Sequence, residues 1–337
     1  MNYIVAAYTT APSLYCNSKS LEEKYYKIFN EKINNIQGLE IPYWGKQINK
    51  FGDQFILDLL NKKWKNILTC IPGTVLALKK NKYFGLASPD PEGRKLAIKM
   101  HRKASNLVDK ILQKKGTKSI VSVVIASAPS HNYFRSSKKY IDAFKKSLDE
   151  IVNFNWNGCK IILEHCDSYH PKLNKNYEKG FMRIENELDI LKELNSNYNF
   201  GYGLNWARSV IEGKSVSTVI NHIKLANKHN LLRAFTYSGV AKNDNLYGKW
   251  KDNHMPFSKV YSGEYYEKNS LLNKTNIKLT MKTLSDLQLD YMGIKLLVFP
   301  KGGYLDLNRM VGVNLEAIYI LNRELKNNNY NIKISKS

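Results

Sequence analysis

The sequence predicts an α/β fold of the (β/α)₈ TIM-barrel class, and three observations support this prediction. Short apolar runs rich in β-branched residues alternate with longer amphipathic segments about eight times along the chain. The chain has 337 residues, 43% of them hydrophobic, and barrels of this kind reach that length as one domain. No internal repeat stands out beyond the alternation. We therefore expect one barrel domain over residues 1–326, followed by a polar C-terminal tail at 327–337 that frays.

Each expected strand ends at or near turn-forming residues, and helical patterns fill the gaps. Residues 20–33, for example, begin with an N-cap serine and repeat apolar side chains at helical spacing, so this helix should pack outside the barrel. Two connections, residues 73–93 and 241–270, are long enough to cover a site. The strands are expected at residues 3–8, 38–42, 66–71, 119–127, 159–164, 200–204, 232–237 and 294–299.

The formal net charge of +23 is high enough to suggest a polyanionic partner. The basic residues are mostly lysines, however, and they are scattered through nearly every predicted helix. No basic stripe or aromatic-interleaved motif accompanies them. We therefore do not expect nucleic acid to be the main partner.

Other features narrow the class of protein further. No run approaches the roughly 20 apolar residues that span a bilayer, and residues 1–12 lack a basic and apolar leader pattern. The four cysteines form no CxxC pair and no dense framework. No nucleotide cofactor is indicated. We expect a cytoplasmic protein that does not bind membranes and that acts on a small molecule.

The densest candidate site follows the fifth expected strand, in the segment ILEHCDSYH. Glu164 at the strand end is a candidate metal ligand or general base, or a structural ion-pair partner for a nearby arginine. His165 is a candidate acid or base, or a hydrogen-bonded imidazole between strand and helix. Period-two alternation places these two side chains on opposite sides of the strand. Asp167 and His170 are loop candidates for substrate contacts.

Polar residues also follow the sixth and seventh expected strands. Asn205 could hold a substrate hydroxyl or serve as a neutral metal ligand. Arg208 could clamp a carboxylate or phosphate of the substrate, or it could pair with Glu164 or Glu212. Ser238 ends the seventh strand. Asp252 and His254, on the long loop, have the chemistry of a metal site or of an acid–base pair.

Weaker candidates complete the set. Ser127, at the end of the fourth expected strand, is a candidate substrate contact, and Glu40 lies near the end of the second. Lys301, followed by two glycines, is placed to bind a phosphate after the last strand. His222 and His229 fall within a predicted helix, and we interpret them as surface or packing residues.

Several segments in this order resemble a known family: GLASPDPEGR, SAPSH, ILEHCDSYHP, KGF, LNWARSVIEGK, LLRAFTYSG and YGKWKDNHMPF. Together they resemble an uncharacterised bacterial family, a domain of unknown function grouped with xylose-isomerase-like TIM barrels, over nearly the whole chain. The family carries no settled activity. The resemblance implies the barrel fold and a pocket built by Glu164, His165, Asp167, Asn205, Arg208, Ser238, Asp252 and His254.

The wider xylose-isomerase-like superfamily includes sugar isomerases, epimerases, dehydratases and metal-dependent abasic-site endonucleases. Its usual metal set is Glu, Asp, His and Glu at the ends of later barrel strands. Glu164 matches that pattern. Asn205 stands where a carboxylate is expected, the seventh strand ends at Ser238 without a histidine, and the expected eighth strand ends without a glutamate.

These observations lead to one main hypothesis and two alternatives. The main one is an isomerase, epimerase or lyase that moves a proton next to the carbonyl of a small sugar or sugar acid. Glu164 would act as base, or would bind Mn, Mg, Co or Zn with Asp252 and His254. His254 or His165 would be the complementary acid or base. The alternatives are a hydrolase, including an abasic-site nuclease, and a non-catalytic sugar-binding barrel; a homodimer is possible in each case.

Overall fold

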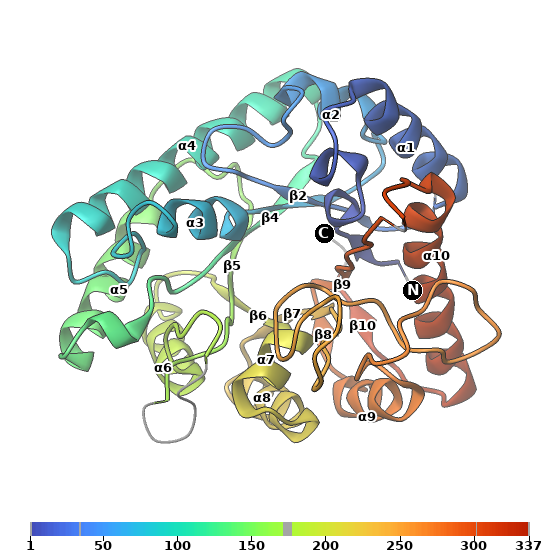
Figure 1. Cartoon of the computed structure of the whole chain (residues 1–337). Helices are drawn as coiled ribbons and strands as arrows, with labels where there is room; N and C mark the ends of the chain where they lie inside the picture. The colour runs from blue at the N-terminus through green and yellow to red at the C-terminus, as the bar shows by residue number, and fades with distance from the viewer. Residues whose placement is uncertain (1, 34, 171–176, 301, 336–337) are drawn as a thin grey trace.

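The computed structural model describes residues 2–33, 35–170, 177–300 and 302–335, and it confirms the barrel. Parallel strands close on themselves, because β1 pairs with β2 on one side and with β9 on the other (Figure 1). Within these ranges the barrel strands are β1 (Ile4–Val5), β2 (Gly38–Pro42), β3 (Asn66–Thr69), β4 (Ile120–Ile125), β5 (Lys160–Glu164), β6 (Gly201–Asn205), β7 (Leu232–Tyr237) and β9 (Tyr291–Ile294).

Alternation along the strands produces two hydrophobic cores. Ile67 on β3, Val124 on β4 and Ile162 on β5 belong to a cluster that fills the barrel. Their neighbours Val123 and Leu163 belong instead to the larger cluster between the strands and the helices. Successive side chains of a strand point to opposite faces, so one strand supplies both cores.

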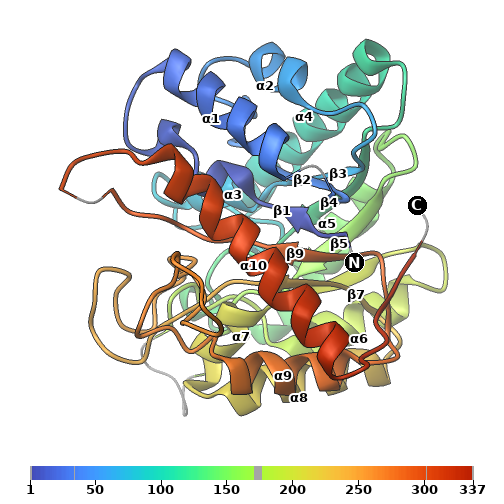
Figure 2. The same ribbon diagram turned by 90° about the vertical axis from the view of Figure 1, so that its right-hand side faces the viewer.

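Helices surround the barrel, and their termini follow local capping rules (Figures 1 and 2). In the long helix α4, the Asp90 side chain accepts a hydrogen bond from the Gly93 amide at 2.7 Å, and Gly116 ends the helix in the left-handed conformation. The α-helices of the described chain are α1 (Lys19–Lys32), α2 (Asp53–Leu59), α3 (Ile71–Leu78), α4 (Pro91–Lys115), α5 (Ser137–Val152), α6 (Ile184–Leu194), α7 (Trp206–Gly213), α8 (Val216–Lys228), α9 (Lys274–Leu284) and α10 (Leu307–Asn327). None of them is long and apolar enough to cross a membrane.

The last barrel strand lies earlier than its apolar pattern predicts. We expected residues 294–299, but β9 ends at Ile294. The chain then leaves the barrel to meet the loop after β7: the Leu297 amide donates to the carbonyl of His254 at 2.7 Å. The apolar run continues because Leu296 and Val298 are buried under that loop, outside the sheet. The residue at the strand end is therefore Lys295.

The C-terminal tail does not fray as far as it is described. β10 (Lys333–Ile334) pairs in parallel with β8 (Gln288–Leu289), just before β9. Ile332 is 7% exposed and packs against the main core. In Figure 2, the chain after α10 runs along the side of the molecule opposite the loop that follows β7. The expectation of a frayed tail was wrong for these residues, because the backbone pairs with β8 and Tyr330, Ile332 and Ile334 pack against the core.

Candidate functional site

A cavity of about 520 Å³ lies where the barrel strands give way to the following connections. This is the end of the barrel that carries the chemistry in enzymes of this fold. Loops after β1, β5, β7 and β9 contribute to it, together with the first turn of α7. Its polar lining includes Tyr8, Lys179, Arg208, Asp252, His254 and Lys295.

Arg208 is the centre of the charged network at this cavity. The Asn205 side chain caps α7 by accepting from the Arg208 amide, so the arginine starts in the first turn of the helix. Its Nη1 donates to Glu164 Oε1, and its Nε donates to Asp252 Oδ2 at 2.9 Å. The side chains of both carboxylates are shielded from solvent, with exposures of 4% for Glu164 and 5% for Asp252. The alternative that Arg208 pairs with Glu164 is therefore what the structure has, with Asp252 as a second partner.

A second cation reaches Asp252 from another loop. Lys179 Nζ lies 2.5 Å from Asp252 Oδ2. Burial acts to raise the pKa of Asp252, but Lys179 and Arg208 outweigh it and hold that pKa well below its usual value. Asp167, predicted as a substrate contact, instead accepts from the backbone amides of Glu178 at 2.7 Å and Lys179 at 2.8 Å. It thereby holds the loop that delivers Lys179.

His254 is placed by backbone pairing at the base of the loop after β7. Gly239 and Met255 exchange two backbone hydrogen bonds of 2.9 and 3.1 Å. A Cβ on Gly239 would lie 2.3 Å from the Met255 carbonyl oxygen, so only glycine permits this approach. The bridge brings His254 Nδ1 to 3.0 Å from Ser238 Oγ and 3.2 Å from Asp252 Oδ1.

The surroundings of His254 favour its neutral form. Burial lowers its pKa, and Asp252 opposes this effect only in part. A carboxylate only accepts hydrogen bonds when ionised, so Asp252 favours the tautomer with the proton on Nδ1. The contacts of His254 with described side chains involve Nδ1. Nε2 is then the basic nitrogen of a histidine that lines the cavity.

Lys295, which sequence reasoning missed, is the third buried cation. Its Nζ lies 2.6 Å from Glu40 Oε1, which also accepts from the Tyr8 hydroxyl at 3.0 Å. Burial acts to lower the Lys295 pKa, but Glu40 outweighs it and the net shift is upward, so the side chain stays protonated. The misplaced last strand hid this residue. Lys179 was missed too, although its KGF segment is one of those that carry the family resemblance.

The residues at the Arg208 cavity do not fit the divalent-metal site that is usual in the xylose-isomerase-like superfamily. Arg208 contacts both Glu164 and Asp252, so a guanidinium stands between the two carboxylates predicted as ligands. The strand ends carry Asn205, Ser238 and Lys295 where the superfamily uses a carboxylate, a histidine and a carboxylate. A divalent cation at this cavity would be repelled by the cationic side chains, which also occupy the carboxylates that would otherwise bind it. We therefore derive no chemistry from a metal at this cavity.

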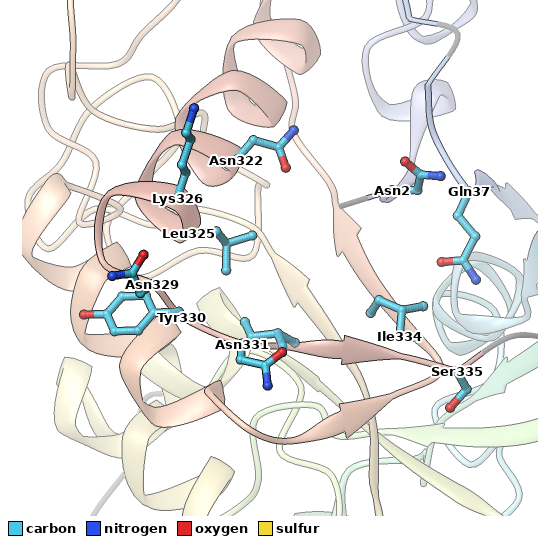
Figure 3. Close-up of a pocket in the computed structure, with 11 residues that line it drawn as sticks. Asn2, Gln37, Asn322, Leu325, Lys326, Asn329, Tyr330, Asn331, Ile334 and Ser335 are labelled. Carbon is cyan, nitrogen blue, oxygen red and sulfur yellow. The ribbon is translucent and has the colours of Figure 1, made fainter.

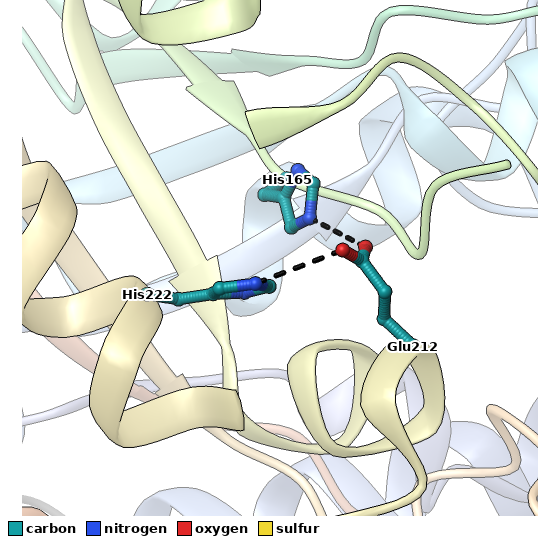
Figure 4. Close-up of side chains that lie close together, drawn as sticks. All are labelled: His165, Glu212 and His222. Carbon is teal, nitrogen blue, oxygen red and sulfur yellow. Dashed lines mark hydrogen bonds and ion pairs between the residues drawn. The ribbon is translucent and has the colours of Figure 1, made fainter. Parts of the chain in front are cut away.

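His165 points away from the cavity into a buried network between β5 and the helices. Its Nδ1 lies 2.7 Å from Glu187 on α6, and its Nε2 lies 2.9 Å from Glu212 on α7. Burial alone would lower its pKa, but the two carboxylates raise it to about 10. Ser127, predicted as a substrate contact, donates to Glu187 in the same network. Figure 4 shows that His222 on α8 also turns toward Glu212.

Two further places complete the comparison with the sequence. Lys301, predicted to bind phosphate, lies outside the described residues. Figure 3 shows a larger hollow, of about 1100 Å³, at the opposite end of the barrel beside Gln37 and the end of α10. Amide and aliphatic side chains dominate its lining, with Lys326 as the charged residue among those described. The described lining of that hollow has no carboxylate and no histidine, so the cavity at Arg208 remains the candidate site.

Comparisons with known proteins agree with this fold. A family model described as "Domain of unknown function (DUF4862)" matches residues 4–308. The chain belongs to the DUF4862 family. An uncharacterized protein of Salmonella typhimurium, STM3670, is 29% identical over 324 residues, which cover 95% of this chain and 97% of that protein. The family resemblance inferred from the sequence motifs is thus confirmed.

Solved structures similar to this DUF4862 chain are xylose-isomerase-like barrels. The IolI protein, in a crystal structure with a bound zinc atom, aligns with a TM-score of 0.57 at 12% identity and covers 96% of this chain and 99% of its own. A D-tagatose 3-epimerase-like protein aligns with a TM-score of 0.58 at 15% identity, covering 96% and 100%. At such identities the likeness establishes the shared fold.

Proposed function

We propose that this DUF4862 protein is an isomerase, epimerase or lyase that transfers a proton next to the carbonyl of a small sugar acid. The observation that carries the proposal is the grouping of one neutral, carboxylate-oriented histidine with three buried cations at a single cavity. Similar structures described as epimerases of the ketoses D-tagatose and D-psicose support a sugar-like substrate and the same reaction class, while the buried cations favour an acidic sugar.

The proposed chemistry starts at His254. Its Nε2 would take a proton from the carbon beside the carbonyl, giving an imidazolium and an enolate. Arg208, Lys179 and Lys295 supply positive charge where the enolate oxygen and a substrate carboxylate would lie, and fixed charges in a buried site stabilise such an oxyanion strongly. Return of the proton to the other face of the same carbon gives an epimer. If the adjacent hydroxyl proton moves to the enolate oxygen, return of the carbon-bound proton to the neighbouring carbon gives an isomer. Loss of a β-hydroxyl as water, with its proton from the His254 imidazolium, instead gives the product of a lyase.

Glu164 has a positioning role in this proposal. It does not line the cavity, and it contacts Arg208, which does. Burial raises the pKa of Glu164 and Arg208 opposes that rise. The carboxylate therefore orients the guanidinium, and the base is His254. Asp252 orients both His254 and Arg208.

Exchange of carbon-bound hydrogen with solvent tests this proposal without knowledge of the product. Pooled aldonates, uronates and ketoses are incubated with the protein in D₂O, and loss of the proton signal next to the carbonyl is followed by NMR. We expect one class of sugar acid to exchange, and His254→Asn to reduce the rate by about 10²–10⁴-fold, the usual contribution of a general base. His229→Asn, which alters the C-cap residue of α8 and no residue that lines the cavity, should exchange normally.

The alternative functions give different outcomes in the same experiment. A non-catalytic sugar-binding protein would bind a sugar acid, seen as broadened ligand signals, with no exchange in wild type. A hydrolase would give no exchange at carbon in this pool, and it would cleave a glycosidic or phosphate ester bond when sugar glycosides and sugar phosphates are added to it. Exchange that persists in His254→Asn would reject His254 as the base.

A further inference from the structure

We propose that His165, Glu212 and His222 bind a divalent transition-metal ion, Zn²⁺ by ligand type, with His170 as the fourth ligand. The site lies between β5 and helices α7 and α8, separate from the cavity at Arg208 (Figure 4). It goes beyond the proposed enzymatic function and does not depend on it.

The spacing of the ligand atoms suits a tetrahedral ion. One ligand atom from each of His165, Glu212 and His222 lies within 4.8 Å of the others. Nε2 of His165 is 2.9 Å from Glu212 Oε2, and Nε2 of His222 is 3.7 Å from Glu212 Oε1. Metal–ligand bonds of about 2.1 Å place neighbouring tetrahedral ligands about 3.4 Å apart. The second distance is too long for a hydrogen bond, yet it fits two ligands of one ion.

A fourth donor approaches from the loop after β5. His170 Nε2 lies 3.2 Å from Glu212 Oε1, and its side chain is 19% exposed. Three imidazoles thus present Nε2 to one buried carboxylate. Neutral imidazole and carboxylate are typical zinc ligands, and His170 gives an entering ion a path from solvent.

Polar contacts at Nδ1 orient the imidazole rings of His165 and His222 as in metal-bound histidines. His165 Nδ1 contacts Glu187 Oε2 at 2.7 Å, and Tyr202 and Ser127 donate to the same Glu187 carboxylate. His222 Nδ1 lies 3.1 Å from Ser209 Oγ. A metal-bound histidine almost always donates its other N–H to a carboxylate or another oxygen, which fixes its tautomer. Both outer partners leave Nε2 directed at Glu212.

The ion would have a structural role. Its ligands come from the end of β5, from α7 and from α8, which are separate elements of the wall around the barrel. His165 extends from the opposite side of β5 to Glu164, so the ion would not contact a substrate held by Arg208. Loss of the ion should therefore lower stability more than it alters the exchange chemistry.

The test uses the full chain with a purification tag free of histidine. The protein is dialysed against a chelator, then titrated with Co²⁺ while visible d–d absorption is recorded, and separately with Zn²⁺ for metal analysis after desalting. We expect one equivalent of Zn²⁺ per chain, and the intense visible bands of four-coordinate Co²⁺. X-ray absorption at the zinc edge should show nitrogen and oxygen ligands with imidazole scattering.

Variants locate the site. His222→Ala and Glu212→Gln should weaken Zn²⁺ binding by at least about 100-fold, and Glu187→Gln by about 10–100-fold, the usual effect of an outer-shell carboxylate. His229→Ala, at the C-terminal end of α8, and Glu164→Gln, beside the cavity at Arg208, should still bind one equivalent of Zn²⁺ per chain. Circular dichroism confirms that each variant is folded.

Two results would overturn the proposal. One is a wild-type protein that retains no Zn²⁺ or gives only the weak spectrum of six-coordinate Co²⁺. The other is a folded His222→Ala protein that binds as wild type does. If His222→Ala does not fold, the absorption-edge spectrum of the wild type still decides, because sulfur or all-oxygen ligation would reject the histidine site. None of these results affects the exchange assay at His254.

Discussion

His254 and its neighbours form a site whose protonation follows from burial. The groups facing the imidazole are Asp252 and Ser238 at its Nδ1, with the charges of Arg208 and Lys295 nearby. Burial and the two cations lower the pKa of His254, while Asp252 raises it. The net shift is downward from 6.5. A base is active only when deprotonated, so this environment keeps His254 competent at neutral pH.

The pH dependence of kcat/KM for exchange should reflect this shift. The rate should fall as pH drops through the His254 pKa, with the midpoint below pH 6.5. Asp252→Asn removes the group that raises this pKa, so the midpoint of the remaining activity should move to still lower pH. The profile is measured between pH 4 and pH 8 in buffers of constant ionic strength. A midpoint above 6.5, or a shift upward in Asp252→Asn, would contradict the assignment.

At the scale of elements, the barrel was predictable and several site residues were not. The alternation that defines β5 correctly placed Glu164 and His165 on opposite faces. The apolar run after residue 294 has the same composition as a strand, so composition could not locate the end of β9 or reveal Lys295. His222 and Glu212 look like ordinary helical residues in sequence. Their meeting depends on how α7 and α8 pack, which is tertiary information.

The loop after β7 depends on one glycine, and this dependence is testable. Gly239→Ala should displace the part of the loop that carries Asp252 and His254, because the alanine Cβ would lie 2.3 Å from the Met255 carbonyl oxygen. A displacement of about 1 Å at a catalytic group costs on the order of 100-fold in rate. The exchange assay and proteolysis of residues 241–270 measure the effect. Gly116→Ala, whose Cβ meets nothing within 4 Å, should lose about 1 kcal/mol of stability and keep its activity.

On the scale of the whole molecule, the two ends of the barrel have different tasks. The end that carries Arg208 holds buried charges, whereas the opposite end is closed by the β8–β10 pair and by the apolar contact of Ile332. The basic residues behind the +23 formal charge are scattered along the sequence. The homodimer expected from the sequence stays a prediction.

A substitution in the C-terminal tail should therefore lower the stability of the fold without changing the rate of the reaction at the Arg208 cavity. Ile332→Ala should lower the free energy of unfolding by about 2 kcal/mol, because it empties a buried site in the tail. Urea denaturation measures the loss. The exchange rate of the folded variant should equal that of wild type, and a proportional loss of exchange would mean that the tail reaches the cavity. Lys333→Ala, at the exposed position of β10 next to Ile332, is the matched control.

The bridge between Gly239 and Met255 also bears on how this protein can be re-engineered. The loop is closed at its base by main-chain hydrogen bonds, which do not depend on the identity of the intervening side chains, and Leu246 near its apex is 68% exposed. Randomised libraries of residues 242–246 should therefore vary the exposed part of this loop without unseating Asp252 and His254. Directed evolution of the loop would begin there, because its main-chain anchor at Gly239 and Met255 lies outside the randomised residues.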